Sequence, residues 1–259
     1  MACCVPKADD ADDGPGRAPH QVAKDAAMTS ARRLHVACAA CLIASACATS
    51  SPLLRQQCYN PDAQLASLLP PFEALRAKGC DAGTSPECDR LRREIARLAV
   101  VCPTHAPTLM ANAVMAYDEL RPADSQQLLD LILAQPRSYP DAAVLRARIG
   151  IEEGNLPFAR RLLAQHIKLV PDHSGLHETY AAALYLDGDM PEARSELTLA
   201  GALGAPRWRI AYHLGLIEEA LGRGVEASQF YAEAIAGNPG WAPAESRLKA
   251  LRARAGASR

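Results

Sequence analysis

The chain has 259 residues, with 28 Lys and Arg against 29 Asp and Glu, so its formal net charge is −1. This balance excludes the generally basic surface that nucleic-acid-binding proteins present. Aromatic residues make up only 5% of the sequence, while Ala, Leu and Arg recur throughout it. Strands are rich in aromatic and β-branched residues, so this composition favours helices. We therefore expect an all-α protein.

The first 27 residues do not have the pattern of a folded segment. They contain Asp9, Asp10, Asp12 and Asp13 and then Gly14-Pro15-Gly16, and no apolar period runs through them. Such a composition cannot bury enough apolar surface to fold. We expect residues 1–27 to be disordered, or not to be translated if Met28 is the true start.

Residues 28–46 have the anatomy of a secretory signal peptide. Arg32 and Arg33 supply a positive region, and an apolar run follows over residues 36–46. The run ends in the small residues Ala44-Ser45-Ala46, which suit a cleavage site. Eleven residues are too few to cross a bilayer of about 30 Å as a helix, so this run predicts a removable signal.

The residues around the predicted cleavage site resemble the lipobox of bacterial lipoprotein precursors. In that family small residues precede a lipidated cysteine, and here Cys47 follows Ala46, with Ala44 where the family prefers Leu. The resemblance implies lipidation of Cys47. Ala48 stands where Asp would resemble an inner-membrane retention signal, so we expect an outer-membrane lipoprotein of the bacterial cell envelope that faces the periplasm. The alternative is ordinary cleavage, which would leave a soluble periplasmic protein.

Residues 47–102 predict a helical hairpin that contains four cysteines besides Cys47. A first helix is predicted from Pro61 to Lys78, and Pro70-Pro71 predict a kink or a break within it. A second helix is predicted from Pro86 to Val101. The residues between the two helices have the chemistry of a turn.

The cysteine positions in this hairpin favour one disulfide pattern. In an antiparallel hairpin Cys80 and Cys88 lie at the turn end, whereas Cys58 and Cys102 lie together at the open end. Four cysteines allow three pairings, and this geometry favours Cys80–Cys88 with Cys58–Cys102. The alternative is a zinc site, but the spacing contains no C-x-x-C knuckle. We expect two disulfides, formed in an oxidising compartment, and no metal.

From about residue 106 the sequence repeats with a period of 34 residues. Small residues recur at this spacing in three columns. The columns are Gly154, Gly188 and Gly222; Ala147, Ala181 and Gly215; and Ala159, Ala193 and Ala227. Glycine ends a helix in a left-handed cap, and the other two columns suit close helix crossings. Each unit is therefore expected to be helix, turn, helix, and the units must stack to bury their apolar faces.

These columns resemble the tetratricopeptide repeat (TPR), and the best unit is Trp208 to Trp241. The resemblance implies an α-solenoid with four TPR-like repeats over residues 103–240. The first repeat is degenerate, because Leu120 and Ser125 replace the usual Gly and Ala. Residues 241–259 are expected to form a capping helix with a basic tail, which solvates the helix or, alternatively, lies on anionic lipid.

In the TPR family the first helices of the units line a concave face that binds a partner protein. The resemblance places Tyr and Arg side chains on that face, and both are enriched at binding hot spots. A peptide or a partner helix would lie across it. The expected groove residues are Met110, Val114, Tyr117, Val144, Arg148, Glu152, Glu178, Tyr185, Arg209, Tyr212 and Glu219.

No known catalytic motif is present in the sequence. His173 and His177 lie one helical turn apart beside Glu178, but a metal ion would need further ligands, so polar surface is expected. The carboxylate pairs Glu152-Glu153 and Glu218-Glu219 are expected on solvated faces. We therefore expect no enzyme, no metal and no cofactor.

The sequence favours a non-enzymatic, lipid-anchored periplasmic scaffold that binds a protein partner through the groove, in envelope assembly. Pilus pilotins and the lipoprotein of the β-barrel assembly machine share this layout. The alternative is a docking or regulatory subunit for a cell-wall enzyme, and a third interpretation is an enzyme whose site the sequence does not reveal. The expected partners are a protein and, through the lipid, a membrane.

Overall fold

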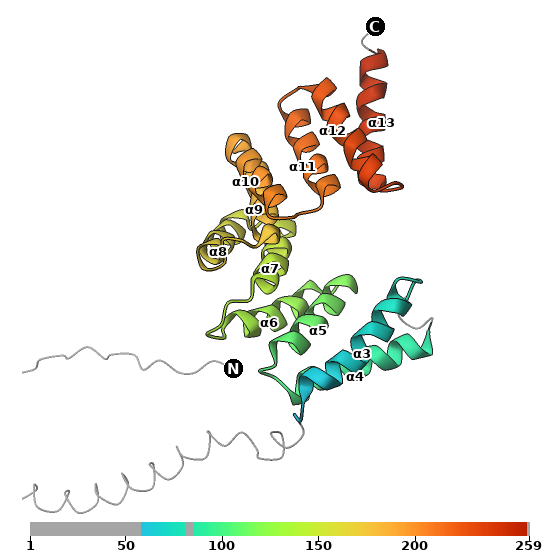
Figure 1. Cartoon of the computed structure of the whole chain (residues 1–259), viewed down its shortest axis with the longest axis vertical. Helices are drawn as coiled ribbons and strands as arrows, with labels where there is room; N and C mark the ends of the chain where they lie inside the picture. The colour runs from blue at the N-terminus through green and yellow to red at the C-terminus, as the bar shows by residue number, and fades with distance from the viewer. Residues whose placement is uncertain (1–57, 81–84, 258–259) are drawn as a thin grey trace, which may run out of the picture. The chain divides into compact units, whose positions relative to one another are not determined.

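The computed structural model describes residues 58–80 and 85–257, which belong to one compact unit, Leu53–Arg259. The predictions for residues 1–46 and for Cys47 lie outside the described residues. The described part is entirely helical and contains no strand (Figure 1). Its helices are α3 (Pro61–Arg76), α4 (Pro86–Val101), α5 (Ala106–Asp118), α6 (Pro122–Leu133), α7 (Pro140–Glu152), α8 (Leu156–Leu169), α9 (Ser174–Leu186), α10 (Met190–Ala202), α11 (Arg207–Ala220), α12 (Gly224–Gly237) and α13 (Ala242–Ala257).

The helices pack in consecutive pairs, and the predicted fold class is confirmed. A hairpin of α3 and α4 precedes the stacked pairs α5–α6, α7–α8, α9–α10 and α11–α12, and α13 packs on α12 (Figure 1). The first helices of three neighbouring pairs, α7, α9 and α11, also contact one another in sequence. The first helices begin at Ala106, Pro140, Ser174 and Arg207, one 34-residue period apart to within a residue.

Proline begins many of these helices and does not break α3. A proline in the first turn costs no hydrogen bond, because that turn has no intrahelical partner for its N–H groups. Pro70 and Pro71 lie inside α3, yet the helix runs unbroken from Pro61 to Arg76. Both prolines are exposed, so the backbone carbonyls that lose their partners are near water. The predicted break at Pro70-Pro71 is therefore absent.

Left-handed residues end the first helix of each repeat. Gly154, Gly188 and Gly222 have φ angles of 76°, 88° and 75°. At the corresponding position of the first repeat Leu120 has a φ of 58°. A Cβ atom makes this conformation costly, so the degenerate first repeat keeps its turn at the expense of strain.

The small-residue columns mark the closest packing between the two helices of a pair. Ala147, Ala181 and Gly215 are buried, and each faces the column that contains Leu163, Leu197 and Tyr231. A Cβ atom on Gly215 would lie 2.6 Å from Cε1 of Tyr231. The last repeat therefore pairs Gly with Tyr at this crossing, whereas the two preceding repeats pair Ala with Leu.

Two disulfides staple the hairpin, and they join the same pairs that the hairpin geometry favours. Cys58–Cys102 has an S–S distance of 2.06 Å, and Cys80 is bonded to Cys88. All but Cys58 are buried, in a core with Leu91, Ile95 and Met115. Met115 belongs to α5, so this core joins the hairpin to the first repeat.

The left-handed backbone conformation of Leu120 leads to a prediction about stability. Leu120→Gly should raise the free energy of unfolding by about 0.5–1 kcal/mol. Glycine removes roughly 1–2 kcal/mol of backbone strain from the folded state, but it also increases the conformational entropy of the unfolded chain, which offsets part of this gain. The side chain is 88% exposed, so little burial is lost. Urea denaturation measures the difference.

The matched control is Leu186→Gly, which alters an exposed leucine at the helical end of α9. Glycine there should destabilise the protein by up to about 1 kcal/mol. If Leu120→Gly destabilises the protein as much as Leu186→Gly does, the backbone at Leu120 is not strained.

Candidate functional site

A hollow of about 400 Å³ runs across the first helices of the second, third and fourth repeats. Its walls come from α7, α9 and α11, which the 34-residue period places side by side. The hollow is lined by Asp141, Val144, Arg148, Ile151, Glu152, His173, Gly175, Glu178, Thr179, Ala182, Arg209 and His213. Five of the predicted groove residues thus meet at one place: Val144, Arg148, Glu152, Glu178 and Arg209.

Most of the remaining lining residues could have been predicted from the 34-residue period. Asp141 and Gly175 lie two periods and one period before Arg209, Ile151 lies one period before Tyr185, and Ala182 lies one period after Arg148. All four therefore share a repeat position with a predicted groove residue. Thr179 and its counterpart one period later, His213, show that a sixth position also faces the hollow.

Glu178 is the electrostatic centre of this hollow. Its carboxylate is buried and lies 2.6 Å from Nη2 of Arg209 and 3.5 Å from Nε2 of His213, both on α11. Burial alone would raise the pKa of Glu178, but hydrogen bonds from His213 and Arg209 outweigh it and hold the pKa below its ordinary value. The carboxylate is therefore charged and ties α9 to α11.

Arg148 is the open cation of the hollow. It is exposed on α7, and no carboxylate pairs with it among the described residues. The neighbouring Glu152 accepts a hydrogen bond from the hydroxyl of Tyr117, which joins α5 to α7. Burial, followed by that hydrogen bond, raises the pKa of Tyr117. Val144 and Ile151 add half-buried apolar surface beside the charge.

Three other predicted groove residues pack within the array. Met110 and Val114 of α5 are half-buried against the core of the first repeat. Tyr185 of α9 is half-buried against the core that contains Ala181 and Leu197. None of the three lines the hollow described above.

The structure places Tyr212 and Glu219 against the last helices rather than in the hollow. The ring of Tyr212 lies 4.5 Å from that of Trp241 and 5.8 Å from that of Tyr231. Glu219 accepts from the hydroxyl of Tyr231 at 2.8 Å and pairs with arginines of α13. Burial, with the Glu219 contact second, raises the pKa of Tyr231. These contacts join α11 to the last helices, and the half-buried Tyr212 and Glu219 do not line the hollow described above.

His173, the N-cap residue of α9, and His177 within α9 have separate surroundings, and the expectation of polar surface is wrong for the buried His177. Nε2 of His173 lies 3.2 Å from Asp141, whereas His177 is buried between Glu196, at 2.6 Å, and the carbonyl oxygen of Pro171, at 2.8 Å. Within the described residues, no group of three or more His, Cys, Asp and Glu side chains could hold a metal ion.

The expectation of a solvated Glu218-Glu219 pair is wrong. Glu218 is only 3% exposed and is paired with Arg194 and Arg223. The arginines come from neighbouring elements, which a single-helix pattern does not reveal.

None of the described helices is long and apolar enough to cross a membrane.

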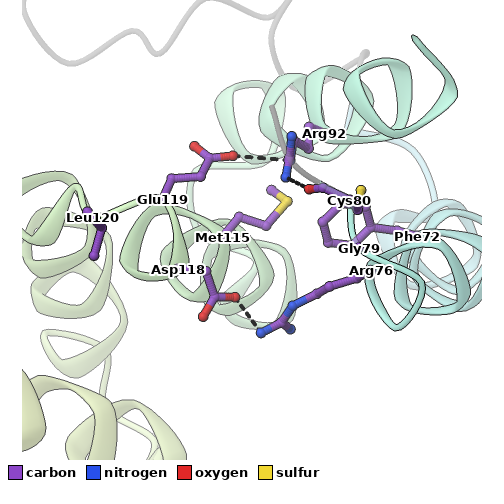
Figure 2. Close-up of a pocket in the computed structure, with 9 residues that line it drawn as sticks. All are labelled: Phe72, Arg76, Gly79, Cys80, Arg92, Met115, Asp118, Glu119 and Leu120. Atoms are coloured by element: carbon purple, nitrogen blue, oxygen red, sulfur yellow. Dashed lines mark hydrogen bonds and ion pairs between the residues drawn. The ribbon is translucent and has the colours of Figure 1, made fainter. Parts of the chain in front are cut away.

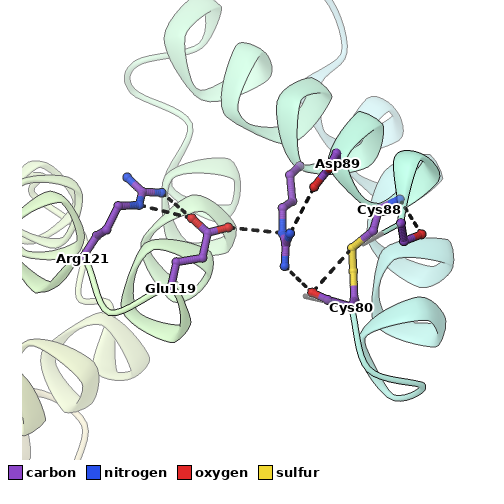
Figure 3. A network of polar contacts seen from close by, with 7 residues as sticks. Cys80, Cys88, Asp89, Glu119 and Arg121 are labelled. Atoms are coloured by element: carbon purple, nitrogen blue, oxygen red, sulfur yellow. Dashed lines mark hydrogen bonds and ion pairs between the residues drawn. A yellow bond between two sulfur atoms is a disulfide. The ribbon is translucent and has the colours of Figure 1, made fainter. Parts of the chain in front are cut away.

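A second hollow, of about 500 Å³, lies where the hairpin meets the first repeat (Figure 2). Its charged groups pair with one another: Arg76 lies 2.5 Å from Asp118, and Arg92 lies 3.2 Å from Glu119. Glu119 also pairs with Arg121, at 2.7 Å, and the Cys80–Cys88 disulfide lies at the other end of the same polar network (Figure 3). These pairs make the place a joint between hairpin and array.

No protein-family model matches the sequence, and no curated protein is detectably similar to it. Solved structures do resemble it. TTC0263, a TPR protein of Thermus thermophilus, is 18% identical, with a TM-score of 0.60 over 72% of this chain and 97% of that one. PilW, a type IV pilus biogenesis factor, is 17% identical, with a TM-score of 0.55 over 74% and 82% of the two chains.

A chain of the APC/C hetero-tetramer Cut9-Hcn1 is 13% identical, with a TM-score of 0.58 over 64% of this chain. The match spans only 33% of that longer chain. At these identities the likeness concerns the fold. The described part of the chain is a helical repeat solenoid, and its structural neighbours are TPR proteins.

The buried Glu178 makes a prediction about stability and pH. Glu178→Gln should lower the free energy of unfolding at pH 7 by about 1–3 kcal/mol, because it removes the charge that faces Arg209 and His213. The folded-state pKa is depressed, so this stabilisation is present above the unfolded value of about 4.5 and is lost as the pH falls through the folded value. Urea denaturation between pH 7 and pH 3 measures it.

Glu226→Gln is the control, because Glu226 is exposed on α12. It should change stability little at any pH. The role given to Glu178 would be contradicted by a variant as stable as the wild type at pH 7.

Proposed function

We propose that the protein is a non-enzymatic scaffold that binds a partner protein in the hollow across α7, α9 and α11. The observation that supports this most is Arg148, which is exposed and pairs with no carboxylate among the described residues, beside half-buried Val144 and Ile151 in the hollow. Arginine next to apolar surface is typical of binding hot spots. The only hydroxyl among the lining residues, that of Thr179, donates to the carbonyl of Gly175 in its own helix.

The proposal extends to the place where the scaffold works. The residues around Cys47 resemble a lipobox, so the chain would be anchored to the outer membrane and face the periplasm. The disulfides of the hairpin suit that oxidising compartment. The likeness to PilW, a type IV pilus biogenesis factor, supports a role in envelope assembly. The alternative is a docking subunit for a cell-wall enzyme, and the identity of the partner separates the two.

The groove prediction uses two arginines of one repeat. Arg148→Glu should abolish recovery of the partner from detergent-solubilised membranes, because it replaces the cation that no carboxylate pairs with by an anion. Arg161→Glu makes the same change on an exposed site of the second helix α8, outside the hollow. Quantitative mass spectrometry should find proteins that the wild type and Arg161→Glu retain and Arg148→Glu loses. Equal recovery by all three would refute the groove.

The anchor prediction concerns Cys47. Cys47→Ser should move the protein from the membrane fraction to the soluble periplasmic fraction, because the thiol that carries the lipid is removed. Immunoblotting of the fractions measures this, and mass spectrometry of the mature N-terminus provides the control. A mutant that stays in the membrane fraction would contradict lipidation.

A further inference from the structure

The inner junctions between repeats share one polar contact. A side chain of each second helix reaches an acid at or near the end of the next first helix, and the donors Gln126, Arg160 and Arg194 are spaced 34 residues apart. The pairs are Gln126–Glu153, Arg160–Asp187 and Arg194–Glu218. The acid is thus a regular part of these junctions.

The last junction, between α12 and α13, lacks this acid. Ser228 occupies the donor position, and its hydroxyl bonds to the carbonyl of Gly224 in its own helix. In α13 Ala255 stands at the repeat position of Glu153 and Asp187, and Arg252 stands at that of Glu218, so neither position carries an acid. Arg252 is exposed and makes no ion pair among the described residues, and no acid follows Glu245 in α13.

An open apolar hollow of about 790 Å³ lies at this junction. Val225 of α12 borders it and is 72% exposed, and Leu251 of α13 faces it from the other wall. Arg252 and Arg254 also line it, and Arg254 is already paired with Glu219 at 3.2 Å. No acidic side chain lines the hollow. Its chemistry is therefore apolar in the middle and positive at one edge.

We propose that the α12–α13 hollow binds a helix of a partner protein that carries apolar side chains and a carboxylate. The apolar side chains would cover Val225 and Leu251, and the carboxylate would pair with Arg252, as Glu218 pairs with Arg194 within the chain. This surface is separate from the hollow across α7, α9 and α11, and its occupancy does not depend on the function proposed for that hollow.

Charge and shape favour this occupant over two others. Two copies of the chain joined symmetrically through this face would place Arg252 and Arg254 of each copy near those of the other, and like charges repel at such a distance. A bilayer surface is flat on this scale and would leave a hollow between two helices unfilled. A helix with an apolar stripe fits between two helices, because side-chain ridges pack into grooves.

The test selects peptides of about 16 residues from a random display library on the full chain, with counter-selection on Val225→Glu. Val225 is exposed, so this variant should fold. Peptides that require Val225 should be rich in Leu, Ile or Phe together with Asp or Glu. One such peptide, labelled with fluorescein, should bind Arg252→Glu about ten-fold more weakly than the wild type.

Lys249→Glu is the matched control, because it reverses a charge on α13 outside the hollow. It should change the dissociation constant less than about two-fold, as should Arg148→Glu. The proposal is overturned if no peptide depends on Val225, if the selected peptides are rich in Lys or Arg, or if Lys249→Glu weakens binding as much as Arg252→Glu.

Two further outcomes would replace the proposal. Arg252-dependent binding to phosphatidylglycerol vesicles, without any selected peptide, would assign the face to a membrane. A dimer in sedimentation experiments that Val225→Glu dissociates would assign it to a second copy of this chain.

Discussion

Close crossing of two helices at one small residue per repeat is the constraint on which this array depends. Ala147, Ala181 and Gly215 leave no room for a larger side chain, since protein interiors are packed as densely as crystals. A change on one helix therefore requires the opposite change on its partner. The last repeat shows this exchange, because Gly215 makes room for Tyr231, whose ring a Cβ atom would meet at 2.6 Å.

The exchange has a consequence beyond packing. A leucine at position 231 would only fill space, whereas the tyrosine carries a hydroxyl to within 2.8 Å of Glu219. The same carboxylate pairs with Arg247 and Arg254, so the packing choice in the last repeat also holds the capping helix. Two of the basic residues of α13 that could bind elsewhere are thereby occupied, and Arg252 is left as an open cation on the hollow.

The sequence predicted those features that depend on local pattern. The period located the starts of the first helices, the prolines located the starts of others, and the hairpin spacing matched the disulfide pairs that the structure contains. It says less where a side chain has a partner in another element. Tyr212 contacts Trp241 and does not line the hollow across α7, α9 and α11. Glu218 was expected on a solvated face, but it is buried and pairs with Arg194 of α10 and with Arg223, the N-cap residue of α12. The position of a residue within its repeat predicts which face of the helix its side chain lies on. It does not predict which side chains of neighbouring helices will contact that side chain.

Contacts between elements also explain why the hollow across α7, α9 and α11 lies in the middle of the array. At one end the joint with the hairpin is held by Arg76–Asp118 and Arg92–Glu119, and the hydroxyl of Tyr117 is committed to Glu152. At the other end α13 covers the last first helix through Trp241 and the Glu219 pairs. Between these closures, α7 keeps the charge of Arg148, which no acid of the described helices neutralises. The interactions at the two ends thus involve the first helices there, and the open part of the face that the first helices form lies at the centre, where Glu178 joins α9 to α11.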